Sequence, residues 1–303
     1  MLSICIPVYN FYVSELVQSL HDEAETLCIA YEILVSDNAS KENFRTENSL
    51  LSSLPNVRYL QSEINLERAG NRNFLFKTAK YPYILFMDCD SRVSKKDYIK
   101  DFLPYCTPGR ICSGGRIYYP EKPEDKKLIL HWKVGRKKES WTAKVRSKKP
   151  NNSFMSCNFL IDKNIFNVVT FDERLHGYCN EDTLFGIELK KKGIVISHID
   201  NPLYHLGLEP AEIFLSKIEE GLQNYHKINF LYHNDPIFIE ACKILRVEKK
   251  IKNLHLAKYC KYFFTVLRKM MYRNLIGKNP SLLVYDLYKL GYLCYCADFN
   301  VVC

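Results

Sequence analysis

The feature that most limits the fold of this chain is YILFM at residues 83–87, a run without polar interruption that leads directly into Asp88, Cys89 and Asp90. A strand with one face in water alternates apolar and polar side chains, whereas a strand covered on both faces is apolar throughout. Strands of the second kind belong to mostly parallel sheets with helices on both sides. Residues 83–87 therefore predict a central strand of a doubly wound α/β fold.

The rest of the first hundred residues repeats this pattern of short apolar and longer amphipathic segments. The sequences SICIPVY, EILVSD, VRYLQS and YILFMDCD predict strands over 3–9, 32–37, 57–62 and 83–90. Three helix-like segments lie between these strands. One begins at Ser14, a candidate cap, a second ends before Pro55, and a third covers 69–80. In open sheets of this kind, ligands bind beyond the carboxyl ends of the strands. The residues that fall there are Tyr9, Asn10, Asp37, Asp88 and Asp90.

The later part of the chain is less regular. Residues 180–193, NEDTLFGIELKKKG, predict a helix because acids at its start and lysines at its end suit the helix dipole, and Gly193 terminates it. Residues 111–119 and 194–199 are strand-like, and from about residue 210 the pattern is helical.

The composition excludes several classes of protein. A chain of 303 residues with 47% hydrophobic content builds a large core, which argues against disorder. Its twelve cysteines include no C-x-x-C pair, and the chain opens on a strand-like segment without a basic and apolar leader. These features predict reduced thiols and a cytoplasmic protein. No apolar stretch approaches the roughly 20 residues that a membrane-spanning helix needs.

The net charge of +9 is concentrated in two segments. Residues 243–273 carry ten Lys or Arg against Glu248, and residues 122–149 carry eleven against three acids. The remaining chain is therefore acidic. No motif that reads a nucleic-acid groove accompanies the charge, so we expect no nucleic-acid partner.

The D-x-D string at 88–90 indicates metal chemistry. If both aspartates continue the strand, their side chains point to the same side and together hold a divalent cation such as Mg²⁺ or Mn²⁺. Such a cation neutralises a diphosphate. Aspartates at strand ends also cap turns, so the string alone does not decide between these roles.

Several stretches in one order carry a more specific signal: SICIPVYN, VSDNAS, NLERAGNRN, FMDCDS and NEDTLFGIELKKKG. Over roughly residues 1–230 this set resembles the family 2 glycosyltransferases, which have the GT-A fold. The resemblance implies a Rossmann-like, mostly parallel central sheet flanked by helices. It also implies inverting transfer of a sugar from a nucleotide-sugar donor, usually a uridine diphosphate sugar, to a hydroxyl of an acceptor.

The resemblance assigns roles to individual residues. The turn from Pro7 through Tyr9 to Asn10 would cradle the nucleotide, and Asp37 would face the base. Arg72 would lie near the base or the phosphates. In the E-D motif, Asp182 is the expected catalytic base, with Glu181 as its orienting neighbour or substitute.

The same resemblance implies a divalent cation, Mg²⁺ or Mn²⁺. Asp90 would coordinate it directly, and Asp88 would meet the ribose or a water on the metal. His205 is the third candidate ligand, because related enzymes often supply a histidine after the E-D helix. A turn histidine with its hydrogen bonds satisfied is the alternative for His205, and His198 is expected to be structural. A base at a helix start is expected to be ionised near neutral pH, because the helix dipole lowers its pKa.

The chain departs from the family pattern in two places. The usual D-D-G-S stretch is represented by Ser36, Asp37, Asn38 and Ala39. In the stretch that the family writes N-x-G-x-x-x-A-R-N, Asn65, Arg72 and Asn73 are present, but Glu67 replaces the glycine. These changes leave the identity of the donor's nucleotide open. Gly114 and Gly115 either form a turn or let the backbone approach the donor sugar.

The resemblance also suggests how the chain is divided. We expect a GT-A catalytic domain over 1–235, with a nucleotide-sugar half over about 1–115 and an acceptor half over about 116–235. Residues 236–303 are expected to form a basic, mostly helical C-terminal extension. Its segment 243–273 either binds an anionic membrane surface with its lysines among the headgroups or packs an apolar face on the catalytic domain.

The favoured function is therefore an inverting, metal-dependent glycosyltransferase. Stand-alone enzymes of this kind usually extend a glycan or a lipid-linked oligosaccharide in bacterial surface polysaccharide synthesis, on the inner face of the plasma membrane. A phosphotransferase with Asp88 as nucleophile is disfavoured by Arg92 at the fifth motif position, and a nucleotidyltransferase by the lack of a glycine-rich phosphate loop. An inactive nucleotide-sugar-binding or membrane scaffold protein is the non-enzyme alternative. The oligomeric state is not predicted.

Overall fold

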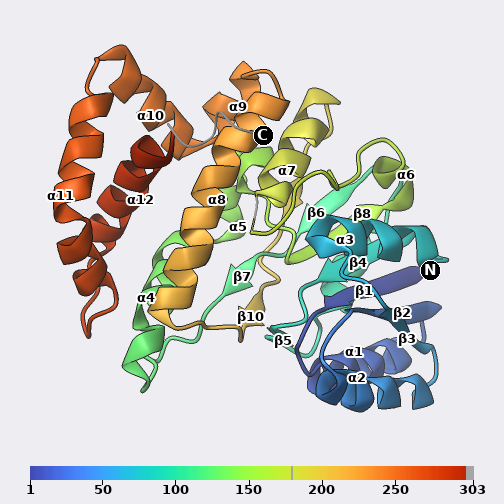
Figure 1. Cartoon of the computed structure of the whole chain (residues 1–303). Helices are drawn as coiled ribbons and strands as arrows, with labels where there is room; N and C mark the ends of the chain where they lie inside the picture. The colour runs from blue at the N-terminus through green and yellow to red at the C-terminus, as the bar shows by residue number, and fades with distance from the viewer. Residues whose placement is uncertain (179, 298–303) are drawn as a thin grey trace. The chain divides into compact units, whose positions relative to one another are not determined.

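The computed structural model describes residues 1–178 and 180–297 (Figure 1). The chain divides into two compact units, each built from several segments. The first contains residues 1–119, 140–176 and 181–207, and the second contains 120–139, 177–180 and 208–303. The expected functional divisions, between donor and acceptor halves at about residue 115 and between catalytic domain and extension at residue 235, stay predictions.

The first unit is built on a seven-stranded sheet with the order β3-β2-β1-β4-β8-β6-β9. Pairing is parallel from β3 through β4 and between β6 and β9, and antiparallel on both sides of β8. The strands are β1 (Leu2–Val8), β2 (Tyr31–Asn38), β3 (Val57–Ser62), β4 (Tyr83–Met87), β6 (Ile111–Ser113), β8 (Asn158–Asp162) and β9 (Ser197–His198). The mixed α/β fold with a mostly parallel central sheet confirms the prediction.

Helices cover both faces of this sheet, as Figure 1 shows for α1 on one side and α3 on the other. Successive residues of β1 enter opposite cores: Ile4 and Ile6 pack with the apolar face of α1, and Cys5 packs with α3. This alternation explains why the central strands are apolar throughout. The helices of this unit are α1 (Ser14–Thr26), α2 (Glu42–Ser49), α3 (Glu67–Thr78), α5 (Ala143–Arg146), α6 (Lys163–Phe166) and α7 (Glu181–Lys191).

Two local predictions were wrong. Ser14 does not cap α1; its N-cap is Val13, whose N–H donates to Oδ1 of Asn48 at 3.1 Å. The strand β4 ends at Met87, so Asp88 and Asp90 lie in the turn before β5 rather than on a pleated strand. The two carboxylates therefore do not share one side of a pleat, and each has its own partners.

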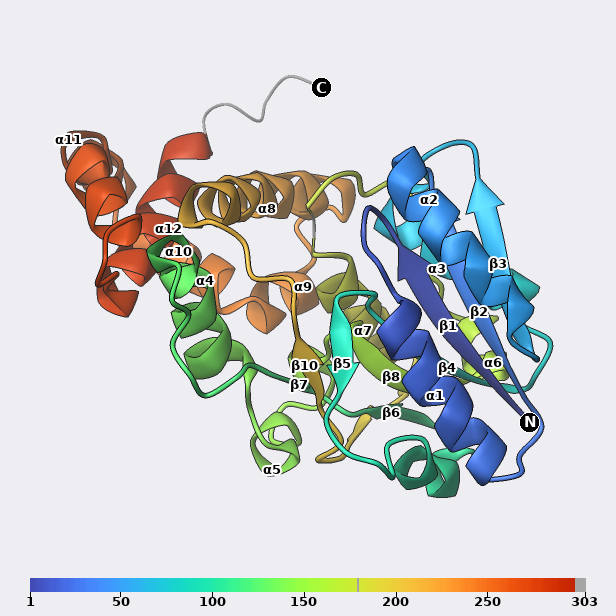
Figure 2. The same cartoon turned by 90° about the horizontal axis from the view of Figure 1, so that it is seen from below.

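A second, three-stranded sheet holds the turn that carries the two aspartates. Its order is β5-β10-β7, with β5 (Ser91–Val93), β10 (Leu203–His205) and β7 (Arg116–Ile117). Figure 2 shows β5 beside β10. The antiparallel register places His205 opposite Ser91, and Leu206 N–H donates to the Asp90 carbonyl at 2.7 Å. The ladder therefore brings His205 next to Asp90 although the two are far apart in the sequence.

The turn between β6 and β7 is fixed by a buried arginine. The guanidinium of Arg146 donates to the carbonyls of Ser113, Gly114 and Ile199. Gly115 has φ +87°, and a Cβ there would lie 2.7 Å from Nη2 of Arg146. Glycine is thus required both by the backbone conformation and by the space that Arg146 fills. This turn sets the position of Arg116, the next residue.

The second unit is helical. It contains α4 (Ile129–Val134), α8 (Ala211–Leu231), α9 (Pro236–Ala241), α10 (Lys243–Asn253), α11 (Ala257–Leu275) and α12 (Leu282–Cys296). Phe264 of α11 packs against Gly291 of α12, where an added Cβ would lie 2.5 Å from the ring. The extra C-terminal helices expected from the sequence are confirmed. Within the described residues, every helix is too short or too polar to span a bilayer.

The Arg146 contact can be tested by comparing two glycines of positive φ. Gly109 has φ +72°, and no described residue comes within 4 Å of the position that a Cβ would take there. Gly109→Ala should therefore cost only backbone strain, about 1 kcal/mol. Gly115→Ala carries the same strain and also displaces Arg146, so we expect about 3 kcal/mol or more. Urea unfolding of both variants measures the difference. Equal losses would show that Arg146 does not fill the space beside Gly115.

Candidate active site

The loops that follow β1 and β2 are tied together at the carboxyl edge of the sheet. Asn10 has φ +51°, its N–H donates to Oγ of Ser40 at 2.8 Å, and its Oδ1 accepts from Lys41 N–H at 2.8 Å. Asp37 is fully buried, and its Oδ1 accepts from Ser40 N–H at 2.8 Å. Tyr9 is exposed. The structure thus brings Tyr9 and Asn10, which follow Pro7 and the end of β1 at Val8, to the same edge as Asp37 near the end of β2.

A chain of buried and half-buried charges follows the sheet's central strands. Nη2 of Arg72 lies 2.8 Å from Oδ1 of Asp88, and Nη1 lies 3.3 Å from Oε1 of Glu181. The other oxygen of Asp88 lies 3.1 Å from Nη2 of Arg116. Arg72 and Glu181 are 6% and 4% exposed, whereas Asp88 and Arg116 are 25% and 19% exposed, so the network has a buried end and a half-buried end. Arg72, Asp88, Arg116 and Glu181 are referred to below as the buried charge network.

Asp90 lies in a different environment from Asp88. Its Oδ1 is buried and accepts no hydrogen bond from the described residues, and Nδ1 of His205 lies 3.5 Å away. A side chain at Gly207 would collide with the other carboxylate oxygen. Burial alone would raise the pKa of Asp90, but His205, Arg116 and Arg68 together lower it well below its usual range. Asp90 is therefore held as a carboxylate.

Asp182 shows the opposite behaviour. It lies in the first turn of α7, where the helix dipole favours the anion. Burial and the neighbouring charge of Glu181 nevertheless raise the pKa of Asp182 to about 6, against the hydrogen bond from Thr183 and the charges of Arg72 and Arg116. The expectation that the dipole would lower this pKa is wrong, because desolvation outweighs it. The group is still mostly ionised at pH 7.

Arg116 is the site residue that sequence reasoning missed. Besides its contact with Asp88, its charge lowers the pKa of both Asp90 and Asp182, so both carboxylates lie within electrostatic reach of one guanidinium. The available signal was an arginine directly after Gly114 and Gly115 at the end of a strand-like segment.

Comparison with known proteins places this geometry in a family. The model of glycosyl transferase family 2 matches residues 3–169, which is more than half of the chain. The chain belongs to this family. It is also 24% identical over 241 residues to a chondroitin synthase of Escherichia coli. The aligned region covers 67% of this chain and 34% of that protein. The chain thus spans about a third of the length of this curated relative.

Solved structures support the GT-A fold. The mannosyltransferase PcManGT from Pyrobaculum calidifontis, in complex with GDP-Man and Mn²⁺, matches with a TM-score of 0.59 at 12% identity, covering 99% of this chain and 88% of that one. S. aureus TarS 1–349 in complex with UDP-GlcNAc matches with a TM-score of 0.51 at 15% identity, covering 99% and 91%.

The two stretches in which this family 2 chain departs from the usual motifs are hydrogen-bonded to each other. Ser36 Oγ donates to Oδ1 of Asn71 at 2.6 Å, so Ser36 and the residue at the motif's alanine position form one buried pair. Asn38 donates to Oδ1 of Asn65 at 2.7 Å and accepts from Leu66 N–H at 2.7 Å. Glu67, which replaces the motif glycine, keeps φ +58°. The backbone conformation that glycine favours is thus retained under a non-glycine residue.

His198 has the structural role expected for it, and Gly114 and Gly115 form a turn, one of the two alternatives left open for them. His198 lies between Nη1 of Arg146, 2.7 Å away, and the Pro150 carbonyl, 2.9 Å away, and burial lowers its pKa. Gly114 packs against Asn158 and the Asn201 carbonyl, which identifies the Gly-Gly pair as a packed turn.

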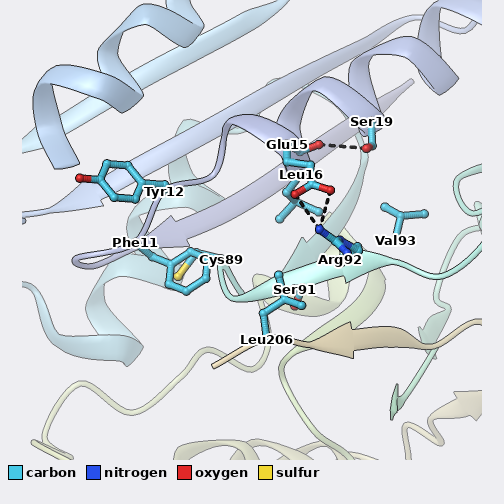
Figure 3. Close-up of a pocket in the computed structure, with 10 residues that line it drawn as sticks. All are labelled: Phe11, Tyr12, Glu15, Leu16, Ser19, Cys89, Ser91, Arg92, Val93 and Leu206. Carbon is cyan, nitrogen blue, oxygen red and sulfur yellow. Dashed lines mark hydrogen bonds and ion pairs between the residues drawn. The ribbon is translucent and has the colours of Figure 1, made fainter. Parts of the chain in front are cut away.

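The remaining residue of the D-x-D string, Cys89, lines a small pocket. Phe11 and Leu206 line the same pocket, as do Arg92 and Glu15, which form an ion pair (Figure 3). Burial raises the pKa of Cys89 far above that of a free thiol. At neutral pH the Cys89 side chain is therefore a neutral thiol.

The residues around Asp90 fit a divalent cation that the substrate helps to bind. Within residues 1–178 and 180–297, no three His, Cys, Asp or Glu side chains form a ready metal cluster. Mg²⁺ is commonly held by one or two carboxylates with substrate phosphates supplying the remaining ligands. The buried Oδ1 of Asp90, without a hydrogen bond from the described residues, suits that arrangement, whereas Asp88 is engaged by two arginines.

The buried charge network gives a stability prediction. Arg72→Gln leaves Asp88 and Glu181 without their shared cation, and removal of one partner from a buried ion pair costs about 3–5 kcal/mol. Arg45→Gln is the matched control, because Arg45 pairs with Glu63, which is 82% exposed, and such pairs contribute under about 1 kcal/mol. Urea unfolding measures both. A loss for Arg72→Gln no larger than for Arg45→Gln would contradict the network.

Proposed function

We propose that this family 2 chain transfers a sugar from a nucleotide-diphosphate sugar to an acceptor hydroxyl with inversion at the anomeric carbon. The observation that carries the proposal is the pair Asp90 and Asp182, whose pKa values are shifted in opposite directions around one guanidinium, that of Arg116. Carboxylates pushed apart in this way take different roles in catalysis. On the leaving-group side, a permanent anion is needed to hold the cation that neutralises the diphosphate. On the acceptor side, a base is needed to accept the proton of the hydroxyl.

The donor would bind at the carboxyl edge of the sheet. Tyr9 is exposed and available to stack on the nucleotide, with Pro7, Asn10 and Asp37 shaping the loops around the base. We favour a uridine diphosphate sugar, as in the TarS complex, although the PcManGT complex contains GDP-Man. Arg116 and Arg72 would act near the diphosphate through the charge that they share with Asp88.

Asp90 would hold a divalent cation, Mg²⁺ or Mn²⁺, with His205 beside it. When bound, the cation supplies Lewis-acid stabilisation of the departing diphosphate. Asp88 would act through its two arginines or through a water rather than as a direct ligand. Complexes of similar structures with Mn²⁺ and Mg²⁺ favour this cofactor class.

Asp182 would be the base that accepts the proton of the acceptor hydroxyl. General base catalysis contributes about 10²- to 10⁴-fold and works best when the pKa lies close to the working pH. Glu181 would orient the site through Arg72, because its carboxylate is 4% exposed and paired with that guanidinium. A single displacement at the anomeric carbon requires no covalent enzyme intermediate.

The acceptor would be a glycan or a lipid-linked oligosaccharide in bacterial surface polysaccharide synthesis. Similarity to a chondroitin synthase, a polysaccharide-forming enzyme by its name, favours this context. Such acceptors are extended on the inner face of the plasma membrane, and the basic segment 243–273 would keep the enzyme at that anionic surface.

The base assignment predicts a pH profile. Because Asp182 must be deprotonated and its pKa is raised to about 6, kcat/KM should fall about tenfold per pH unit below pH 6 and level off above it. Asp182→Asn should lose about 10²-fold or more at every pH and lose this acid limb. The measurement is transfer or donor hydrolysis with a panel of nucleotide sugars. An unchanged profile in Asp182→Asn would exclude Asp182 as the base.

The metal assignment predicts a chelator-sensitive enzyme. EDTA should abolish turnover and Mn²⁺ or Mg²⁺ should restore it, and Asp90→Asn should lower turnover by about a hundredfold or more. Calorimetric titration of Mn²⁺ in the presence of UDP should show weakened binding in Asp90→Asn. Asp97→Asn, an exposed aspartate, is the control. Full activity in EDTA would rule out the metal.

A further inference from the structure

The second unit presents an apolar strip on one side of α11. Tyr259, Phe263, Val266 and Met270 follow the spacing of four, three and four residues that aligns side chains on one helix face. They are 52%, 60%, 59% and 63% exposed, and Tyr262 beside them is 65% exposed. Scattered apolar residues are common on surfaces, but a contiguous strip along successive turns of one helix marks an interaction site.

The strip is not the face by which α11 packs in its own unit. Phe264 is buried against Tyr288 and Tyr292 of α12, and Arg268 pairs with Glu219 of α8 at 3.3 Å. At 100° per residue, the direction midway between Phe264 and Arg268 lies nearly opposite the strip. The helix is therefore apolar on two sides, and only one of them is used within the described residues of the second unit.

Basic residues lie along one edge of the strip. Lys258, Lys269 and Arg273 are exposed and fall on the same side of it at helical spacing. The whole segment 243–273 holds ten Lys or Arg and one acid, Glu248, which is buried and paired with Lys252 at 2.6 Å. A surface that combines aromatic and aliphatic side chains with cations and no exposed acid complements an anionic lipid surface.

We propose that α11 docks this enzyme on an anionic bilayer, with Tyr259, Phe263, Val266 and Met270 entering the headgroup region and Lys258, Lys269 and Arg273 contacting lipid phosphates. The proposal rests on the proposed function for its biological sense, because a lipid-linked acceptor is extended at that surface. It goes further by assigning the contact to one helix face with two separable components. Aromatic side chains at the interface and cations among phosphates are the usual division of such a helix.

The electrostatic component can be separated by matched charge removal. Each Lys or Arg near an anionic surface contributes a factor of about five in partitioning, so Lys258→Gln/Lys269→Gln/Arg273→Gln should weaken binding to vesicles of phosphatidylcholine and phosphatidylglycerol by on the order of a hundredfold. Lys144→Gln/Lys148→Gln/Lys149→Gln removes three exposed charges from the other basic segment and serves as control. Co-sedimentation at low and high salt measures both. An equal loss in the two triple variants would overturn the assignment to α11.

The apolar component is tested by Phe263→Ser/Val266→Ser, with Ile64→Ser/Val195→Ser as control because both residues are 67% exposed on the first unit. We expect only the α11 variant to lose binding to the anionic vesicles. The proposal would be overturned if the wild-type protein did not bind these anionic vesicles, or if it bound vesicles of pure phosphatidylcholine equally well. So would a dimer that the α11 variant dissociates, since the strip would then be covered by a second copy.

The test is independent of the reaction. Turnover of a nucleotide sugar in solution, without vesicles, should be the same in the α11 variants and the wild type. Vesicle binding without any turnover would contradict the proposed function and leave the docking surface intact. Turnover without vesicle binding would contradict the docking surface and leave the proposed function intact.

Discussion

The interaction on which the site depends is the ion pair between Arg72 and its two carboxylates. Glu181 and Arg72 are almost fully buried, and an ion of either kind left unpaired there would destabilise the fold by several kcal/mol. Arg72 of α3 joins the turn after β4 to the start of α7, which lies 109 residues further along the chain than Arg72. The position of Asp182 next to Glu181 therefore follows from the same contact that holds Asp88.

This arrangement also explains how two similar aspartates can take different roles. Asp90 faces His205 and Arg116, so surrounding positive charge outweighs its burial. Asp182 has an acidic neighbour, Glu181, whose own cation is shared with Asp88, so burial prevails and its pKa rises to about 6. One carboxylate is thus a permanent anion suited to a cation, and the other can exchange a proton near neutral pH. The buried charge network is the physical origin of the difference.

The sequence predicted the sheet well because its signal is local. An uninterrupted apolar strand indicates two covered faces, and α7 carries its own end signals, with acids in its first turn and lysines in its last. The contacts of the site are not local: Arg72 and Glu181 are 109 residues apart, and Arg116 and Asp88 are 28 apart. Arg116 also lies on a strand of two residues, which is too short to show a period. The partners of Asp88, and hence its separation from Asp90, could not be read from the spacing D-x-D.

Helix α11 shows a second limit of pattern reading. The sequence left two alternatives for it, internal packing or a lipid surface, because an amphipathic period reports an apolar face without saying what covers it. In the structure, one apolar side of α11 packs on α12 through Phe264 and Gly291. Another apolar side of α11 is exposed beside Lys258, Lys269 and Arg273. Internal packing therefore accounts for only part of the apolar surface of α11. The docking proposal gives the exposed part a partner that accepts aromatic side chains and cations along one strip, and an anionic bilayer does so without a shaped pocket.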